Sequence, residues 1–221
     1  MDLDFSPVWD GWREIAHGTL VTIEVTVGAI VLGCLIGLMV GLGRLDPRRR
    51  LVHGLCTAYV SFIRGTPLLV QLFIWFFGLP HFGINFPALF CGVVGMGIYS
   101  GAYVSEIVRG AIQSIDRGQM EAARSLGMPR RMAMRQIVIP QAVVRMIPPL
   151  GNEFIALIKN SSLVSLLTIA DVMHEGQKII STSYRSLEVY LAIALVYFVL
   201  TNLTGLALRG VEHRLRAEGL V

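Results

Sequence analysis

Charged and amide side chains occur inside stretches of this sequence that are otherwise strongly apolar, and they are the first candidates for chemistry. A charge at membrane depth is costly and usually faces a protein interior or a water-filled cavity. Glu24 and Glu106 are two such charges, and the residues expected to line a solute path are Arg64, Asn152, Glu153, Lys159 and Asn160. The last four form two pairs with seven-residue spacing, which places each pair on one side of a helix. They predict a path for a small polar solute; the alternative is a structural salt bridge from Arg64 to Glu106 or Glu153.

Catalytic and metal-binding arrangements are not recognisable. The three cysteines lack a C-x-x-C pair, and the five histidines are scattered without metal-ligand spacing. Ser161 and Ser162 have no recognisable base, so a membrane enzyme is the weakest hypothesis. The pattern G-x-x-x-x-G-K-[ST] does not occur in these 221 residues. We therefore expect no catalytic residue, no metal site and no cofactor bound by this chain, and any ATP-driven work would need a partner.

Long apolar helices would position the polar side chains. The chain is 54% hydrophobic and only 15% charged, which is too apolar for an ordinary soluble domain. About 20 helical residues cross the roughly 30 Å of hydrocarbon in a bilayer. Five such stretches are expected at 18–43, 55–79, 88–110, 147–170 and 188–209. Because the runs are continuous and not alternating, we expect an all-α polytopic membrane protein and not a barrel.

The distribution of basic residues predicts the orientation. Fourteen of the 19 Lys and Arg residues lie in 44–54, in 109–146 or from Arg209 onward. By the positive-inside rule these segments are cytoplasmic, which places the amino terminus outside and the carboxyl terminus inside. The charges are thus topogenic, and nucleic-acid binding is not indicated. We expect an external segment 1–17, a membrane domain 18–210 and a cytoplasmic tail 211–221.

Two local patterns suggest how the helices pack and bend. Gly33, Gly37 and Gly41 repeat every four residues and offer a smooth face to a neighbouring helix. The segment Gly65, Thr66 and Pro67 interrupts the second stretch, since proline removes a donor and disfavours helical geometry in the residue before it. A kink is expected there, and it is a candidate gate, with a static packing kink as the alternative.

The basic connector 111–146 is the segment that bears most directly on function. Gln119 to Leu126 favours helix, Gly127 supplies a left-handed stop, and a second helix over 129–139 should end at Pro140. Ala122 and Ala123 would form a face of small residues suited to a groove on a soluble partner. A merely basic connector is the alternative.

The connector resembles a known motif. GQMEAARSLGMPRRMAMRQIVIPQA, residues 118–142, is similar to the EAA loop of integral membrane subunits of binding-protein-dependent ABC importers. FIRGTPLLVQ, YVSEIVRGAIQSID and PPLGNEFIALIKNSSLVS are similar to the polar amino acid subfamily. The resemblance covers about residues 18 to 210 and implies the fold of a type I ABC importer permease in the bacterial inner membrane.

That resemblance also implies partners and roles. A second permease, identical or paralogous, would share the solute pathway, two cytoplasmic ATPase subunits would bind ATP and Mg²⁺, and an external binding protein would deliver the amino acid. Arg64 or Lys159 could hold its carboxylate and Glu153 its ammonium. An ATP-independent channel or secondary carrier is the alternative, but it leaves the loop unused. The residues expected to contact the ATPase are Glu121, Ala122, Ala123, Arg124 and Gly127.

Overall fold

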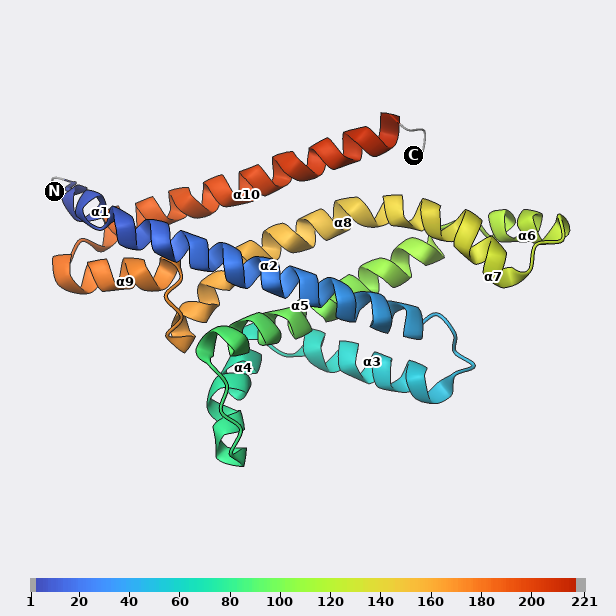
Figure 1. Cartoon of the computed structure of the whole chain (residues 1–221), viewed down its shortest axis with the longest axis horizontal. Coiled ribbons are helices and arrows are strands. Elements are labelled where there is room, and N and C mark those ends of the chain that lie inside the picture. The colour runs from blue at the N-terminus through green and yellow to red at the C-terminus, as the bar shows by residue number, and fades with distance from the viewer. Residues whose placement is uncertain (1–2, 218–221) are drawn as a thin grey trace.

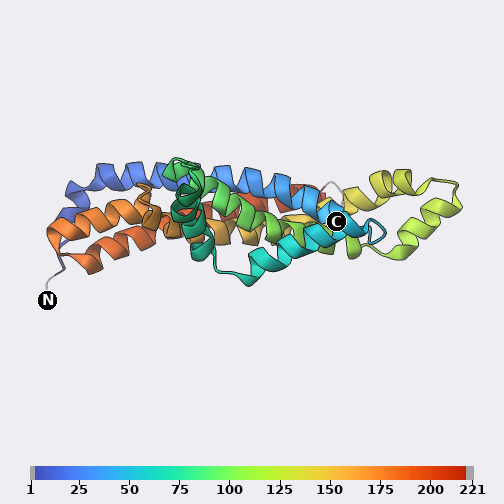
Figure 2. The same ribbon diagram turned by 90° about the horizontal axis from the view of Figure 1, so that it is seen from below.

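The computed structural model describes residues 3–217, which form an elongated all-helical bundle (Figure 1). Its long helices run along one common direction, and a short helical hairpin projects at one end (Figures 1 and 2). The elements are α1 (Ser6–Asp10), α2 (Trp12–Gly43), α3 (Arg50–Gly65), α4 (Leu68–Phe73), η1 (Ile74–Gly78), η2 (Leu79–Phe82), α5 (Ala88–Gln113), α6 (Arg117–Ser125), α7 (Arg130–Ala133), η3 (Met134–Val138), α8 (Ile139–Asn160), η4 (Ser161–Leu167), α9 (Val172–Ser183) and α10 (Ser186–Ala217).

The all-α membrane fold is confirmed, with a qualification on the number of spans. Within the described residues, α2, α5 and α10 are long and apolar enough to cross a membrane. The count reaches five only if the bent pairs α3 with α4–η2, and α8–η4 with α9, each count as one span. The first stretch also begins earlier than expected, because α2 runs without a break from Trp12. The expected tail starts as a continuation of α10 to Ala217, and residues 218–221 lie outside the described residues.

The break after Gly65 is confirmed, and it divides the stretch expected as one span, 55–79, into two helices. Thr66 is extended, with φ −123° and ψ 145°, as a residue before proline should be. The axis then turns by 106°, so that α4 leaves the bundle sideways. The side-chain amide of Gln71 ties the two parts together by donating to the carbonyl oxygens of Ile63 at 2.9 Å and Thr66 at 3.2 Å, and to Thr66 Oγ1 at 2.8 Å.

The expected end of a connector helix at Pro140 is wrong. The chain continues through Pro140 into α8, which begins at Ile139 and not near residue 147. Immediately before it, Met134–Val138 forms a π-helical turn, and Ile139 N donates to Met134 O. This wider turn accommodates the ring and the missing N–H of the proline, so the helix need not stop.

The glycine spacing has its expected consequence, because α2 and α5 pack closely. A Cβ on Gly33 would lie 3.0 Å from Cβ of Ser100, and one on Gly41 would lie 2.9 Å from Cβ of Val108. At Gly37 the space is filled by Val104. The prediction of a helix-packing face is confirmed, and this face fixes the depth of α5 against α2.

Helix α9 was not anticipated from the sequence. It packs beside α1 and the start of α10 at the end of the bundle that carries the amino terminus (Figure 1). Asp171 caps it by accepting a hydrogen bond from His174 N at 2.9 Å, and Val172 N donates to Thr22 Oγ1 at 3.2 Å. Val172 and Val189 are buried together in this region. The helix is thus held to both α2 and α10.

Candidate functional site

Helix α6 forms a short, firmly capped projection. Asp116 caps its start by accepting from Gly118 N at 2.6 Å. At its end Gly127 has φ +82°, and two bonds close the turn: Gly127 N donates to Arg124 O at 3.0 Å and Met128 N donates to Ala123 O at 3.2 Å. This paired bonding is a Schellman motif, which requires the left-handed residue that glycine supplies without strain. The chain can therefore reverse into α7 immediately after α6.

The expected face shared by Ala122 and Ala123 is wrong. Ala122 is exposed, whereas Ala123 is only 6% exposed and faces the protein interior. Instead, Leu126 is 85% exposed at the tip of the hairpin, an apolar side chain that the sequence did not single out. Glu121 and Arg124 are exposed as well. The exposed surface of the hairpin therefore includes Glu121, Ala122, Arg124, Leu126 and Gly127.

The hairpin is anchored to the bundle and does not hang free. Arg145 Nη1 on α8 donates to Ser114 O at 2.6 Å and approaches Ser114 Oγ at 3.1 Å, which joins α8 to the end of α5. Beneath the hairpin, Ile115, Val138 and Ala142 are buried in one apolar cluster that continues along α5. The base of the hairpin is therefore joined to both α5 and α8.

Glu106 gathers three arginines from three helices. Its carboxylate accepts hydrogen bonds from Arg44 on α2 and from Arg109 on α5, the latter at 2.6 Å. Arg64 Nη1 on α3 lies 3.8 Å from the same carboxylate. The side chains of Arg44 and Glu106 are only 12% and 20% exposed. The structural ion pair considered for Arg64 thus exists with Glu106, and three positive charges share one negative charge where α2, α3 and α5 meet.

Arg64 also connects to a second polar group on α5. Its guanidinium lies 5.1 Å from the ring centre of Tyr103, and Tyr99 Oη donates to Tyr103 Oη at 3.1 Å. One turn away, Ser100 Oγ donates to the half-buried carboxylate of Glu153 at 3.1 Å. The sequence missed these α5 residues, because serine and tyrosine in an apolar helix carry no signal of their own.

The other residues of the expected solute path are not gathered into this group. Lys159 is exposed near the end of α8, and Asn160 is half-buried next to it. Asn152 is exposed and lines a shallow cavity between α8 and α10 together with Arg209 and Glu212. Of the expected path, the single chain brings only Arg64 and Glu153 toward one polar group.

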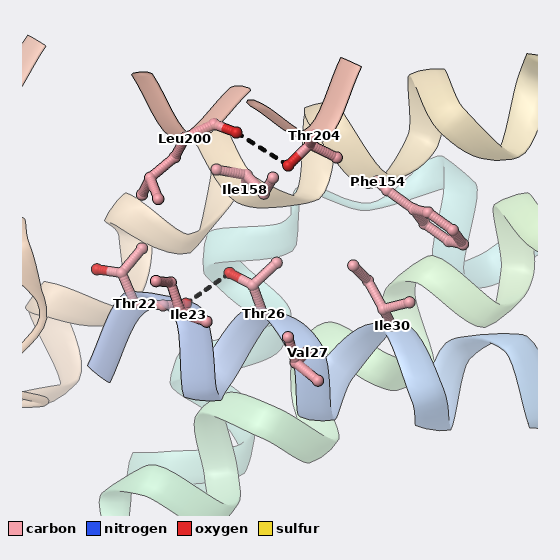
Figure 3. Close-up of a pocket in the computed structure, with 9 residues that line it drawn as sticks. All are labelled: Thr22, Ile23, Thr26, Val27, Ile30, Phe154, Ile158, Leu200 and Thr204. Carbon is pink, nitrogen blue, oxygen red and sulfur yellow. Dashed lines mark hydrogen bonds between the residues drawn. The ribbon is translucent and has the colours of Figure 1, made fainter. Parts of the chain in front are cut away.

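A separate cavity of about 230 Å³ opens between α2, α8 and α10 (Figure 3). Its lining is Thr22, Ile23, Thr26, Val27, Ile30, Phe154, Ile158, Leu200 and Thr204. The hydroxyls of Thr22, Thr26 and Thr204 donate within their own helices to carbonyl oxygens four residues earlier, at 2.9, 2.7 and 2.9 Å. No charged side chain lines this slot, so it is built for apolar contact and not for a charged solute.

These features define a class of protein: an all-helical membrane transport subunit with a capped helical hairpin at one end and no nucleotide-binding motif. The chain belongs to the family described as the binding-protein-dependent transport system inner membrane component, whose model matches residues 29–217. The sequence resemblance is thereby confirmed, and the chain is a permease subunit, not an enzyme.

Relatives and solved structures agree with this assignment. The chain is 38% identical to the probable glutamine ABC transporter permease protein GlnM of Bacillus subtilis, over 96% of this chain and 94% of that protein. It is 34% identical to the glutamine transport system permease protein GlnP of Escherichia coli, over 98% and 99%. A crystal structure of an amino acid ABC transporter with histidines matches with a TM-score of 0.92 at 42% identity, covering 97% of this chain and 100% of that chain. An inward-facing MetNI methionine ABC transporter shares the fold, with a TM-score of 0.77 at 18% identity, over 92% and 96%.

Proposed function

We propose that this chain is the membrane subunit of an ATP-driven importer that carries a polar amino acid across the bacterial cytoplasmic membrane. Support comes from the relatives named as glutamine permeases and from the likeness to an amino acid ABC transporter. The basic connectors support an orientation with the amino terminus outside and the carboxyl terminus in the cytoplasm.

In this proposal the chain works in a complex. A second permease, identical or paralogous, completes the pathway, and an external binding protein delivers the solute, as the family description of binding-protein-dependent transport suggests. Two cytoplasmic ATPase subunits bind ATP and Mg²⁺, because the 221 residues contain no nucleotide-binding loop of their own.

The observation that carries the proposal is the surface of the α6 hairpin. Ala122 on α6 and Leu126 directly after it are both exposed, and Gly127 fixes the end of the helix. A small residue and an apolar residue are therefore available to contact a groove on a soluble partner. An ATP-independent channel or carrier would need neither this surface nor its anchoring through Arg145 to Ser114. The hairpin is the element that would convert ATPase closure into movement of α5 and α8.

For the solute itself, we propose that the polar group around Arg64 and Glu153 contributes to the path. A zwitterion requires a cation for its carboxylate and an anion for its ammonium. Ser100 orients Glu153, and Tyr103 lies against Arg64. Lys159, Asn152 and Asn160 would take part only where a second permease faces α8.

The test places a bulky side chain on the hairpin. Ala122→Trp should abolish retention of the ATPase subunits during purification and remove substrate-stimulated ATP hydrolysis in vesicles, because the groove admits only a small residue there. The control is Ala16→Trp, since Ala16 is also an exposed alanine but lies near the start of α2, at the end of the bundle opposite to α6 (Figure 1). Transport at the parental rate by Ala122→Trp would refute the proposal.

A further inference from the structure

Two cavities follow one another along the contact between α8 and α10. The slot of about 230 Å³ described above lies between α2 and α10, and Figure 3 shows Thr26 and Leu200 on opposite sides of it with Ile158 of α8 between them. The second cavity, of about 260 Å³, begins at Ile155 and Gly205, each of which directly follows a residue of the slot. Its lining is Pro148, Gly151, Asn152, Ile155, Gly205, Leu208, Arg209 and Glu212. The two cavities line up as one groove, which is apolar in the slot and charged at the other end.

The groove spans about one leaflet of a membrane. Between Glu188 and Arg209, α10 contains no charged residue, and about 20 helical residues cross the roughly 30 Å of hydrocarbon. Arg209 therefore lies at the membrane surface. Leu200 is the slot residue of α10 farthest from it, and the nine residues between these positions correspond to roughly 14 Å at about 1.5 Å per residue. The groove thus reaches from the headgroup region to about the middle of the bilayer.

The slot suits hydrocarbon and not water. A buried water molecule needs about two to four polar partners. The hydroxyls of Thr22, Thr26 and Thr204 already donate within their own helices, so the slot offers only their remaining lone pairs. Val27 lines the slot and is 53% exposed, so the slot opens onto the apolar outer surface of the bundle. An apolar cavity of about 150 Å³ holds one benzene ring, and this slot therefore has room for several carbons of an acyl chain.

The charged end of the groove fits a headgroup that carries both signs. Arg209 and Glu212 are three residues apart on one face of α10, and no ion pair joins them in the part of the chain that the structure describes. Arg209 Nε donates to Gly205 O at 3.4 Å, and the Nη groups can bind an anion. Arginine binds phosphate through two parallel hydrogen bonds, and a carboxylate accepts hydrogen bonds from an ammonium group. Glu212 would repel a headgroup that is only anionic.

We propose that this groove binds one phospholipid with a phosphoethanolamine headgroup. One acyl chain lies in the slot, the phosphate lies at Arg209 and the ammonium lies at Glu212. The lipid belongs to the leaflet in which α10 ends, which is the cytoplasmic leaflet in the orientation proposed above. Since α2 and α10 both pack on α8, the acyl chain fills the gap between them. Asn152 then lies beside the headgroup and not in the solute path.

Retention of lipid by the intact importer tests the site. The complex is purified in a mild detergent, and native mass spectrometry identifies its bound phospholipids. The parent should retain phosphatidylethanolamine, and Gly205→Phe should lose most of it. A Cβ on Gly205 would lie 3.7 Å from Ile155 Cδ1, so the added ring enters the groove. The matched control is Gly210→Phe on the same helix, which lines neither cavity and has no atom within 4 Å of an added Cβ. This variant should retain the parental amount.

The headgroup contact has its own pair of variants. Arg209→Gln should lower the retained phosphatidylethanolamine several-fold. Arg214→Gln should not, because Arg214 is an exposed arginine of the same helix that lines neither cavity. Equal retention by the two variants, or retention of phosphatidylglycerol as strong as that of phosphatidylethanolamine, would overturn the assignment of the headgroup.

A second measurement uses the unsubstituted protein, so it decides the question even if Gly205→Phe does not assemble. The importer is reconstituted in vesicles of phosphatidylethanolamine and phosphatidylglycerol in equal amounts, with a trace of phosphatidylethanolamine that carries a diazirine midway along one acyl chain. After irradiation, adducts should concentrate on peptides that contain Phe154, Ile158 or Leu200. Several-fold fewer are expected at Leu35, which is 57% exposed on α2 outside the groove.

Two outcomes would overturn the lipid site itself. The first is a parent complex that retains no phospholipid. The second is a set of adducts spread evenly over the outer faces of α2 and α10, or absent from the slot because another protein covers it. The inference requires only a membrane subunit, which membership of the family shows. A failure of the lipid site therefore leaves the proposed solute and coupling untouched, and a failure of those leaves the lipid site to be judged by its adducts.

Discussion

The close packing of α2 on α5 gives a prediction whose size can be worked from the structure. A Cβ on Gly37 would lie 2.5 Å from Cβ of Val104, closer still to its Cγ1, and 3.0 Å from the carbonyl oxygen of Gly101. Real side chains do not come this close, so Gly37→Ala must force the two helices apart. Overpacking of this kind costs about 1–3 kcal/mol. A matched control is Gly110→Ala, because Gly110 lies in α5 with no atom within 4 Å of an added Cβ.

Both variants gain helix propensity, but only Gly37→Ala introduces overpacking. Alanine favours a helix over glycine by roughly 0.5–1 kcal/mol at either position, so the difference between the variants isolates the overpacking. We expect Gly37→Ala to be less stable than Gly110→Ala by about 2 kcal/mol, or roughly 4–8 °C in Tm. The assay is the temperature at which half of the purified complex is lost from its size-exclusion peak.

A rescue variant makes the reasoning refutable. Val104→Ala removes Cγ1, the atom nearest to an added methyl on Gly37, and leaves Cβ in place, at the cost of some buried apolar surface. Combined with Gly37→Ala, it should restore part of the loss, with a favourable coupling of about 1 kcal/mol. If Gly37→Ala is as stable as Gly110→Ala, or if Val104→Ala simply adds its own loss, the close contact does not govern the packing of α2 on α5.

Two further predictions concern polar groups. Glu106→Gln keeps the shape of the side chain but leaves Arg44 and Arg109 without their shared carboxylate. Tm should therefore fall by an amount that corresponds to about 1–3 kcal/mol, and added salt should recover part of this loss. A parental Tm at low salt would contradict the prediction. Gln71→Leu removes the donor that satisfies three oxygen acceptors at the break and should cost about 1–3 kcal/mol. The control is Gln136→Leu, at an exposed glutamine, and equal Tm values for the two would refute the prediction.

Features that depend on local periodicity could be read from the sequence. Gly33, Gly37 and Gly41 repeat at the helical period, so their common face and its use in packing follow directly. Gly127 could be identified as a stop because a left-handed turn requires glycine at that point. The bonds of the Schellman motif then follow from the chain geometry, independently of what surrounds the loop.

Features that depend on which side of an element packs could not be read in this way. In α6 the small Ala123 is buried and the large Leu126, directly after the helix, is exposed, which reverses the order that hydrophobicity alone would give. Only the position of the neighbouring helices decides it. The expectation that a helix ends at Pro140 fails for a similar reason. The π-helical turn that accommodates this proline is a feature of the backbone, and no particular residue type indicates it.

A proline interrupts a helix in the same way before a slight kink and before a sharp sideways turn, so the sequence alone does not show how large the turn after Gly65 is. Pro67 weakens the helix, and the carbonyl groups freed in α3 would then be unsatisfied at apolar depth. The chain resolves this with Gln71, which is 5% exposed and donates back to Ile63 and Thr66. Pro67 leaves the carbonyl of Ile63 without its usual donor in a straight helix too, whereas a sharp turn brings the side chain of the next helix beneath the open end of the previous one. A buried glutamine four residues after a membrane proline is therefore the residue to examine when a span turns sideways.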